Sequence, residues 1–80
     1  MSKEQTVHVG DRAYRVIREG IDWFVYYDSE RRYVGKILLR PHDREGPYIA
    51  FFRDERVGKM LLNVEDCVAL IDRYRAVVSQ

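Results

Sequence analysis

Side chains able to perform catalysis or bind a metal are few in this sequence, and they are scattered. The 80 residues include two histidines and one cysteine. His8 and His42 lie far apart, and no HExxH motif or Cys/His spacing typical of zinc sites occurs. His42 and Asp43 are neighbours, but adjacent side chains rarely point at each other, and no nucleophile accompanies them. We therefore expect no enzymatic activity, no catalytic residues, no metal site and no cofactor.

Lysine follows glycine in a run that occurs twice, as Val34–Leu39 (VGKILL) and Val57–Leu62 (VGKMLL). Neither copy has the second glycine and the Ser/Thr of a phosphate-binding loop. Two interpretations stay open. Lys36 and Lys59, with Arg31 and Arg56 from the turns, can form two similar basic spots that touch the phosphates of a nucleic acid or the acidic groups of a partner. Alternatively, a β-hairpin has been duplicated, its glycine permits a bulge or a close approach of strands, and its lysine discourages edge-to-edge aggregation.

Aromatic residues make up 12% of the chain and are its most informative feature. Tyrosine combines an apolar ring with a polar tip, which suits a surface that is half wet. Aromatic side chains on one sheet face can stack on single-stranded bases while basic side chains follow the backbone. They can equally form the centre of a protein interface, or only pack in the core. The candidate binding residues are Tyr26, Tyr33, Tyr48, Phe51, Lys36, Arg53, Arg15 and Arg18.

Composition and charge limit the class of protein. Hydrophobic residues at 46% and charged residues at 34% are typical of a globular domain, and the length allows one domain, 1–80. No apolar run is long enough to span a bilayer, and the N-terminus lacks the apolar segment of a signal peptide, so we expect a cytoplasmic protein. The net charge of +1 argues against a generic binder of polyanions. Cys67 is predicted to be a small buried hydrophobe.

Short strands must position these aromatic residues. Apolar and polar side chains alternate in several runs bounded by Gly, Pro and Asp, which is the pattern of antiparallel strands. The segment Pro41–Pro47 (PHDREGP) is predicted to be a loop. The repeat extends upstream, where residues 25–27 (VYY) correspond to 50–52 (AFF), so the duplicated unit is a whole hairpin. The predicted strands are 6–9, 13–19, 23–27, 33–40, 48–52 and 57–62.

The hydrophobic period changes from two to 3.6 after Asn63, which predicts a helix over 63–78. Asn63 is a favoured N-cap residue, and Glu65 and Asp66 suit the first turn. The predicted apolar face holds Val64, Cys67, Val68, Ile71, Tyr74 and Val78. The opposite face, expected to be solvated, holds Glu65, Asp66, Asp72, Arg73 and Arg75.

The expected fold class is α+β. A five- to six-stranded antiparallel β-meander or small bent barrel (6–62), built on the duplicated hairpin, carries one C-terminal α-helix (63–78) packed on it. Several strands are apolar on both faces, whereas a helix of about 15 residues is only about 22 Å long and covers part of one face. The second face must be covered by barrel closure, a second copy of the chain or a ligand.

These features predict a small non-enzymatic binding module. It acts through protein–protein interaction or self-association by way of an aromatic sheet face, so its partner is another protein or a second copy in a homodimer. The alternative is a regulatory protein that binds single-stranded DNA or RNA with the same face. No interaction with a membrane is expected.

Overall fold

Six strands and one helix follow one another along the chain, as the alternation and the change of period predict. The computed structural model describes residues 3–28, 32–40 and 46–78. The strands are β1 (Lys3–Val9), β2 (Arg12–Glu19), β3 (Asp22–Tyr27), β4 (Arg32–Leu39), β5 (Tyr48–Phe52) and β6 (Glu55–Leu61), and the helix is α1 (Val64–Val78). The first strand begins before the predicted Thr6, because residues 3–5 also pair with β2.

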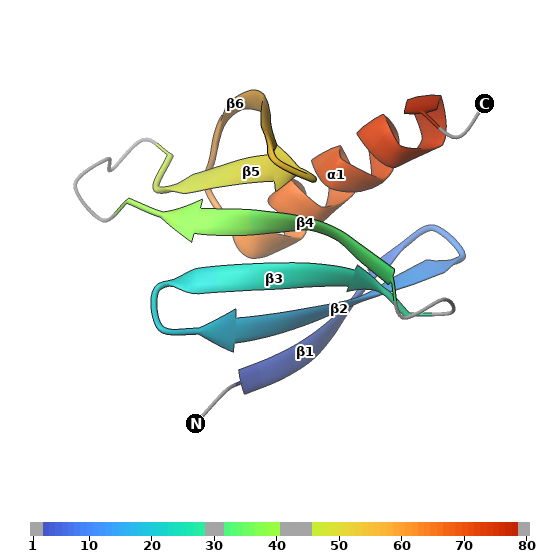
Figure 1. The fold of residues 1–80 in the computed structure, drawn as a ribbon, viewed down its shortest axis with the longest axis horizontal. Coiled ribbons are helices and arrows are strands. Elements are labelled where there is room, and N and C mark those ends of the chain that lie inside the picture. Colours follow the sequence, from blue (N-terminus) through green and yellow to red (C-terminus); the bar gives the residue numbers. More distant parts are fainter. Residues whose placement is uncertain (1–2, 29–31, 41–45, 79–80) are drawn as a thin grey trace.

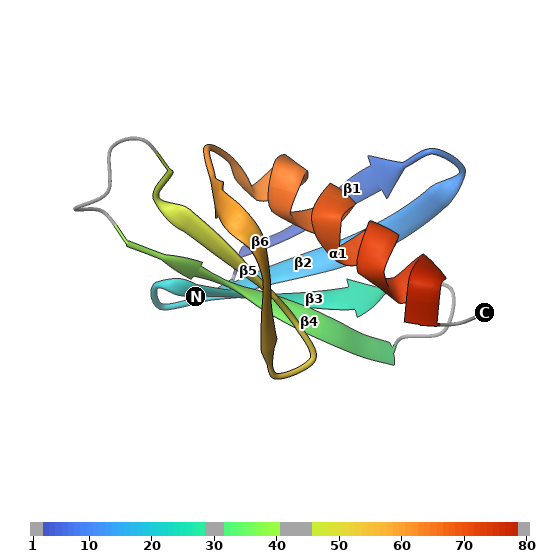
Figure 2. The ribbon, with the colours of Figure 1, turned by 90° about the horizontal axis from the view of Figure 1, so that it is seen from above.

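Each strand pairs with the next in an antiparallel meander, β1-β2-β3-β4-β5-β6 (Figure 1). The helix lies against one face of this sheet, which curls around it (Figure 2). α1 contacts β4, β5 and β6 and also reaches β1 at the opposite edge. The edge strands β1 and β6 do not pair with each other, so of the two predicted forms the structure shows the open meander.

The core lies between the helix and the sheet face that it covers. Alternate residues of the strands point into it, so that Val16, Val25 and Ile37 are fully buried. The core cluster consists of Val7, Tyr14, Val16, Trp23, Val25, Val34, Ile37, Ala50, Phe52, Val57, Val64, Cys67, Val68 and Ile71. The prediction that Cys67 is buried is confirmed, and burial, together with Asp66 and Glu65, raises the pKa of its thiol to about 12.

Asn63 caps the start of α1, as predicted. The backbone N–H of Asp66 donates a hydrogen bond to Oδ1 of Asn63 at 2.7 Å. The other end of the helix differs from the prediction, because Tyr74 and Val78 are 40% and 54% exposed. The last turn extends beyond β5 and β6 (Figure 1), so its apolar side chains find no sheet beneath them.

The two VGK runs lie at irregularities of the sheet. In the β3–β4 hairpin, Val25 pairs with Gly35 and Tyr26 pairs with Tyr33, which leaves Val34 as the extra residue of a bulge. The β5–β6 hairpin has a register shift of its own, and Gly58 there has a φ of 67°. The glycines therefore serve a bulge and a close approach of strands, as the structural interpretation of the repeat predicts, while the role of the two lysines stays a prediction.

Candidate functional site

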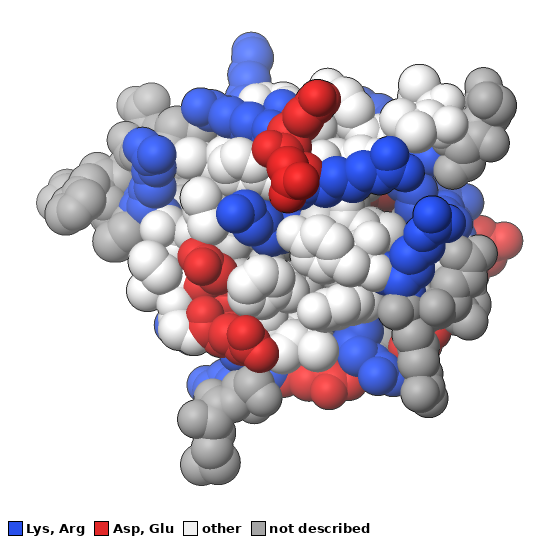
Figure 3. All heavy atoms as spheres, in the orientation of Figure 1, with Lys and Arg blue, Asp and Glu red and all other residues white. Residues whose placement is uncertain are grey.

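The sheet face opposite α1, called the outer face below, carries apolar side chains that the helix does not cover. Residues next to core positions point to this face, so Phe24 lies between the buried Trp23 and Val25. The helix lies behind the sheet in Figure 1, and the same view in Figure 3 shows uncharged side chains on this face, bordered by both basic and acidic side chains. The uncharged residues placed here by the strand alternation are Ile17, Phe24, Tyr26, Tyr33, Leu38 and Phe51.

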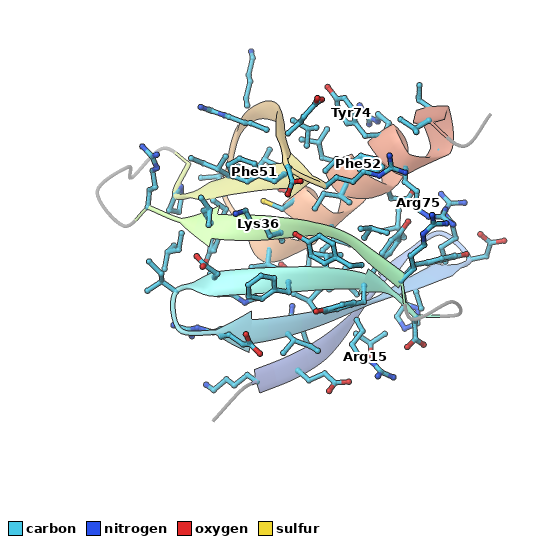
Figure 4. All side chains as sticks on the ribbon, in the orientation of Figure 1. Arg15, Lys36, Phe51, Phe52, Tyr74 and Arg75 are labelled. Atoms are coloured by element: carbon cyan, nitrogen blue, oxygen red, sulfur yellow. The ribbon has the colours of Figure 1, made fainter. Side chains whose placement is uncertain are left out.

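One row of side chains crosses the whole outer face, with one residue from each strand. Strand pairing fixes its order as Glu4, Ile17, Phe24, Lys36, Phe51 and Arg56, and we call it the central row. Lys36 and Phe51 lie side by side on neighbouring strands (Figure 4), and Nζ of Lys36 is 5.4 Å from the ring centroid of Phe51. Among the described residues, no carboxylate lies within 4 Å of Lys36 or Arg56. The row is therefore acidic at the β1 edge and basic towards the β6 edge.

A second row contains Arg15, Tyr26 and Tyr33. The two tyrosine rings meet edge to face with centroids 5.7 Å apart. Arg15 forms ion pairs with Glu4 at 2.8 Å and with Asp28 at 3.1 Å, so its charge is balanced within the monomer. Tyr33 is 39% exposed, and its pKa is raised by partial burial and then by nearby Asp54 and Tyr26.

A shallow depression of about 230 Å³ opens on this face. Arg15, Ile17, Tyr26 and Asp28 line it. An apolar wall from Ile17 and Tyr26 next to a balanced ion pair suits an apolar side chain better than a free anion.

The structure brings together most, but not all, of the predicted binding residues. Tyr26, Tyr33, Phe51, Lys36 and Arg15 share the outer face. The signal that identified them was the aromatic and basic composition of alternating positions. Tyr26 and Phe51 are half-buried by their neighbours in the sheet, but no second layer covers them within the part of the chain that the structure describes.

The other predicted residues, Tyr48, Arg18 and Arg53, do not belong to the outer face. Tyr48 packs against the core, with its ring edge-to-face on Trp23 at 5.5 Å. The guanidinium of Arg18 lies 5.0 Å from the centroid of the same Trp23 ring. Arg53 lies in the β5–β6 turn with a φ of 58°, and its guanidinium is 5.2 Å from the Phe52 ring.

Ile17 and Phe24 belong to the outer face but were not predicted to bind, and Arg56, also on this face, was named only with the basic spots of the repeat. All three are members of the central row, and each pairs with its neighbour in that row on the adjacent strand. The alternation places Phe24 on the same side as Tyr26, so that much was readable from the sequence. Placing Ile17 and Arg56 opposite particular neighbours needed the strand register, which depends on turn geometry and bulges.

Asp72, Arg12 and Tyr14 form a buried polar group that joins α1 to the sheet. The sequence did not predict this group. Asp72, expected on the solvated helix face, is only 4% exposed. Nε and Nη2 of Arg12 each donate a hydrogen bond to its carboxylate at 2.6 Å, and the hydroxyl of Tyr14 donates another. Arg75 was also expected on the solvated face of the helix, but its guanidinium packs on the sheet, 3.9 Å from the centroid of the Tyr27 ring.

The pKa shifts in this group indicate a structural role, in which its hydrogen bonds hold α1 on the sheet. The Arg12 hydrogen bonds and charge, with the Tyr14 hydrogen bond, lower the pKa of Asp72 despite its burial. Burial, followed by the hydrogen bond to Asp72, raises the pKa of Tyr14 to about 12. No buried side-chain N or O atom of the described residues lacks a hydrogen-bond partner, so the polar atoms of this group are satisfied within the fold.

Some predictions concern residues outside those described, namely Arg31, the His42–Asp43 pair and most of the Pro41–Pro47 loop. Within residues 3–28, 32–40 and 46–78, no group of three or more His, Cys, Asp or Glu is placed to hold a metal ion. Over the same ranges, no helix has both the length and the apolar composition needed to cross a bilayer.

The sequence and fold were compared with known proteins. No protein-family model matches the chain, and neither curated protein sequences nor solved structures gave a significant match.

Proposed function

We propose that this chain is a small non-enzymatic binding module that uses its outer face to bind another protein surface. The observation that carries the proposal is the apolar outer face, which α1 leaves uncovered because it packs on the opposite side of the sheet. A sheet with one solvated face normally presents polar residues there. Here, instead, three of the six residues of the central row are apolar, namely Ile17, Phe24 and Phe51. Aromatic and Arg residues around such a patch are typical of a protein interface.

Charge favours a protein over a single-stranded nucleic acid as the partner. Arg15 is already neutralised by Glu4 and Asp28, and these carboxylates would also face an approaching phosphate backbone. The whole chain carries a net charge of only +1. A protein surface can offer both signs of charge, which matches the mixed border of this face.

Single-stranded nucleic acid remains the second candidate, because Lys36 lies beside Phe51 among aromatic rings that could stack on bases. That function predicts an oligonucleotide complex whose affinity falls steeply as salt rises. Absence of any mobility shift at low salt would exclude it.

Two tyrosines of nearly equal exposure allow a matched test of the proposed function. Tyr33 on the outer face is 39% exposed, and Tyr74 on α1 is 40% exposed. Each is replaced in turn by the photo-reactive residue benzoylphenylalanine, and cells producing the chain are irradiated. We expect protein adducts from position 33 and far fewer from position 74.

The adducts are identified by mass spectrometry. A defined protein attached at position 33 supports the proposal. No adduct at that position, equal labelling at both positions, or an adduct removed by nuclease contradicts it.

A further inference from the structure

We propose that the free edge of β1 pairs with an extended segment of another protein, which becomes a seventh strand and places one large apolar side chain in the groove beside that edge. The groove lies on the helix side of the sheet, so this site is separate from the outer face and goes beyond the proposed function. Three observations carry the proposal: an uninterrupted edge strand, backbone groups directed away from the sheet, and a groove with aromatic lining next to them.

Of the two edge strands, β1 is the regular one. It forms one edge of the sheet (Figure 1), and its 7 residues pair with β2 in an unbroken register. At the other edge, the pairing of β6 contains a register shift, and Gly58 has a φ of 67°. Bulges protect an edge from added strands, whereas a regular edge accepts them. β1 is therefore the edge that is able to receive a further strand.

The turn after β1 determines which of its backbone groups are free. Gly10 and Asp11 form a two-residue turn with a φ of 63° at Gly10. Such a turn closes with a hydrogen bond between its flanking residues, which are Val9 and Arg12. Val9 therefore directs its backbone groups to β2.

Hydrogen-bonded and non-hydrogen-bonded pairs alternate along an antiparallel ladder, so the next pair, His8 and Ala13, is not hydrogen-bonded. A bond elsewhere agrees with this, because the carbonyl oxygen of Ala13 accepts a hydrogen bond from the N–H of Asp28, which follows β3, at 3.1 Å. The alternation continues to the start of the strand. The β1 residues whose N–H and C=O groups point to the free edge are therefore Glu4, Thr6 and His8.

A groove of about 370 Å³ opens beside the first half of this edge. Its apolar lining comes from the sheet and from the junction of β6 and α1, namely Val16, Trp23, Tyr48, Leu62 and Val64. On β1, Val7 is buried in the core, whereas Lys3 and Gln5 are exposed and form one wall of the groove. A residue of an added strand that lies opposite Gln5 points its side chain to the same sheet face as Gln5. That side chain enters the groove, and the lining suits a large apolar group.

The charges around the groove favour a carboxylate near that apolar side chain. Lys3 and Arg18 line the groove as cations, and Glu65 contributes a carboxylate. Among the described residues, no carboxylate lies within 4 Å of Lys3 or Arg18. The position opposite Lys3 on an added strand is two residues from the position opposite Gln5 and lies on the same face. The partner is therefore an extended segment with a large apolar residue and an acidic residue two positions from it.

A library of random linear peptides displayed on phage, selected against the purified chain, is the probe for this partner. We expect the enriched peptides to share a large apolar residue with Asp or Glu two positions from it. The most enriched peptide is then synthesised with a fluorescent label. Its anisotropy is expected to give a dissociation constant on the order of 10 micromolar, because one added strand makes a small contact. Failure to enrich this pattern overturns the proposal.

Two substitutions at one position separate the backbone from the side chain. Thr6→Pro removes an N–H group that points to the free edge and leaves the hydrogen bonds between β1 and β2 in place. Thr6→Val keeps the N–H group and has nearly the same shape. We expect Thr6→Pro to weaken peptide binding at least about tenfold and Thr6→Val to stay within about twofold of the original. Circular dichroism of both variants checks that the fold is retained.

A charge reversal tests the acidic residue of the peptide. Lys3→Glu is expected to weaken binding about fivefold, and a peptide with Lys in place of its acidic residue should bind this variant more tightly than it binds the original chain. Lys36→Glu makes the same change on the outer face and is expected to stay within about twofold. Equal losses from the two substitutions overturn the assignment of the groove.

Amide hydrogen exchange, followed by NMR, reads the edge directly and needs no variant. The N–H groups of Glu4 and Thr6 are expected to exchange rapidly in the free chain and to become protected when the peptide is bound. Those of Gln5 and Val7 bond to β2 and should be protected in both states. Unchanged exchange at Glu4 and Thr6 in the complex overturns strand addition.

This site and the outer face fail independently. A selected peptide that binds Thr6→Pro as tightly as the original chain overturns the edge site, and protein adducts at position 33 still support the proposed function. Self-association of the chain that Thr6→Pro abolishes, with no peptide selected, overturns this partner in favour of β1 from a second copy. Loss of adducts at position 33, with the peptide still bound at the edge, contradicts the proposed function alone.

Discussion

A single buried carboxylate joins the helix to the sheet by hydrogen bonds. Asp72 accepts hydrogen bonds from Arg12 and Tyr14, and these three side chains join the start of β2 to the middle of α1. Removing one member of such a group leaves the others without their partner. We therefore expect the group to help fix the position of the helix along the sheet.

Asp72→Asn is expected to lower the free energy of unfolding by about 2 kcal/mol, because hydrogen bonds to a charged group in a buried site are lost. Urea denaturation followed by circular dichroism measures the change. Asp11→Asn is the matched control: Asp11 also lies near Arg12, at 3.6 Å, but its side chain is 94% exposed. That variant is expected to stay within about 0.5 kcal/mol of the original. Equal effects of the two substitutions would contradict a special role for Asp72.

The pH dependence of stability follows from the lowered pKa of Asp72. Because the folded state holds this proton less tightly than the unfolded state, the stabilisation is present above the ordinary pKa of 3.8 and is lost as pH falls through the folded pKa. The difference in unfolding free energy between the original chain and Asp72→Asn should be constant above about pH 5 and should shrink below about pH 4. Urea titrations of both proteins at several pH values measure it. A difference that stays unchanged down to about pH 2 would rule this out.

The sequence could not reveal the Asp72 group, and the reason is the distance along the chain. Asp72 follows the buried Ile71 in a helix, and the apolar periodicity assigns that position to the solvated side. Its partner Arg12 comes from β2, and no local pattern connects the two. Tyr48 is similar: its side depends on how the chain enters β5 after the preceding loop, so the aromatic composition alone misplaced it.

Two glycines act differently in the two copies of the duplicated hairpin. A Cβ at Gly35 would run into the backbone carbonyl oxygen of Phe51 on the neighbouring strand β5. A Cβ at Gly58 would meet only the end of the Leu70 side chain, but the positive φ there disfavours other residues. The first glycine lets two strands approach, and the second shapes a bulge beside the helix.

Alanine substitutions distinguish these roles. Gly35→Ala is expected to lower the free energy of unfolding by about 3 kcal/mol, because backbone must move. Gly58→Ala should cost about 1–2 kcal/mol, since a side chain can rotate away while the φ strain remains. Gly20→Ala isolates that strain, because Gly20 has a φ of 66° and nothing within 4 Å of its Cβ position. Denaturation midpoints rank the three variants, and a Gly35 variant no weaker than the Gly20 variant would refute the explanation.

The elements themselves were largely readable from the sequence. The alternation predicted all six strands, Asn63 indicated the start of the helix, and the VGK repeat indicated bulged hairpins. The end of the helix behaved otherwise. Its apolar periodicity continues through Tyr74 to Val78, but a periodic pattern does not say where the sheet beneath it stops.

At the scale of the molecule, one helix holds together a sheet that is open at both edges. α1 contacts β1 as well as β4, β5 and β6, so its buried residues link the two ends of the meander. For a domain of this size a stability on the order of 4–12 kcal/mol is typical, which leaves little reserve. Losing part of the helix contact therefore affects the whole fold.

Ile71→Ala is expected to lower the free energy of unfolding by about 3 kcal/mol, because Ile71 is fully buried and its removal leaves a cavity. Calorimetry should show the whole chain unfolding in one transition at a lower temperature. Val77→Ala on the same helix serves as control, since Val77 is 67% exposed, and should change stability by less than about 0.5 kcal/mol. Loss of the helix alone, with the sheet still folded, would contradict this dependence.

The general architecture could be inferred before the structure was known, but the choice between an open sheet and a closed barrel could not. Closure requires β1 and β6 to meet, and strand patterns do not encode the tilt and stagger that this needs. The apolar residues on both strand faces indicated only that a second layer was required. Crosslinking from position 33 tests which molecule supplies that layer.

The position of Cys67 makes the rate of its chemical modification a measure of how often the core opens. It is the chain's single cysteine, it lies fully buried on the side of α1 that packs on the sheet, and burial keeps it protonated at neutral pH. A thiol reagent can therefore react only in moments when the helix lifts from the sheet. Without any engineered label, the rate of modification reports how often the core layer opens. If a second copy covers the other side of the sheet, that rate should fall as the protein concentration rises.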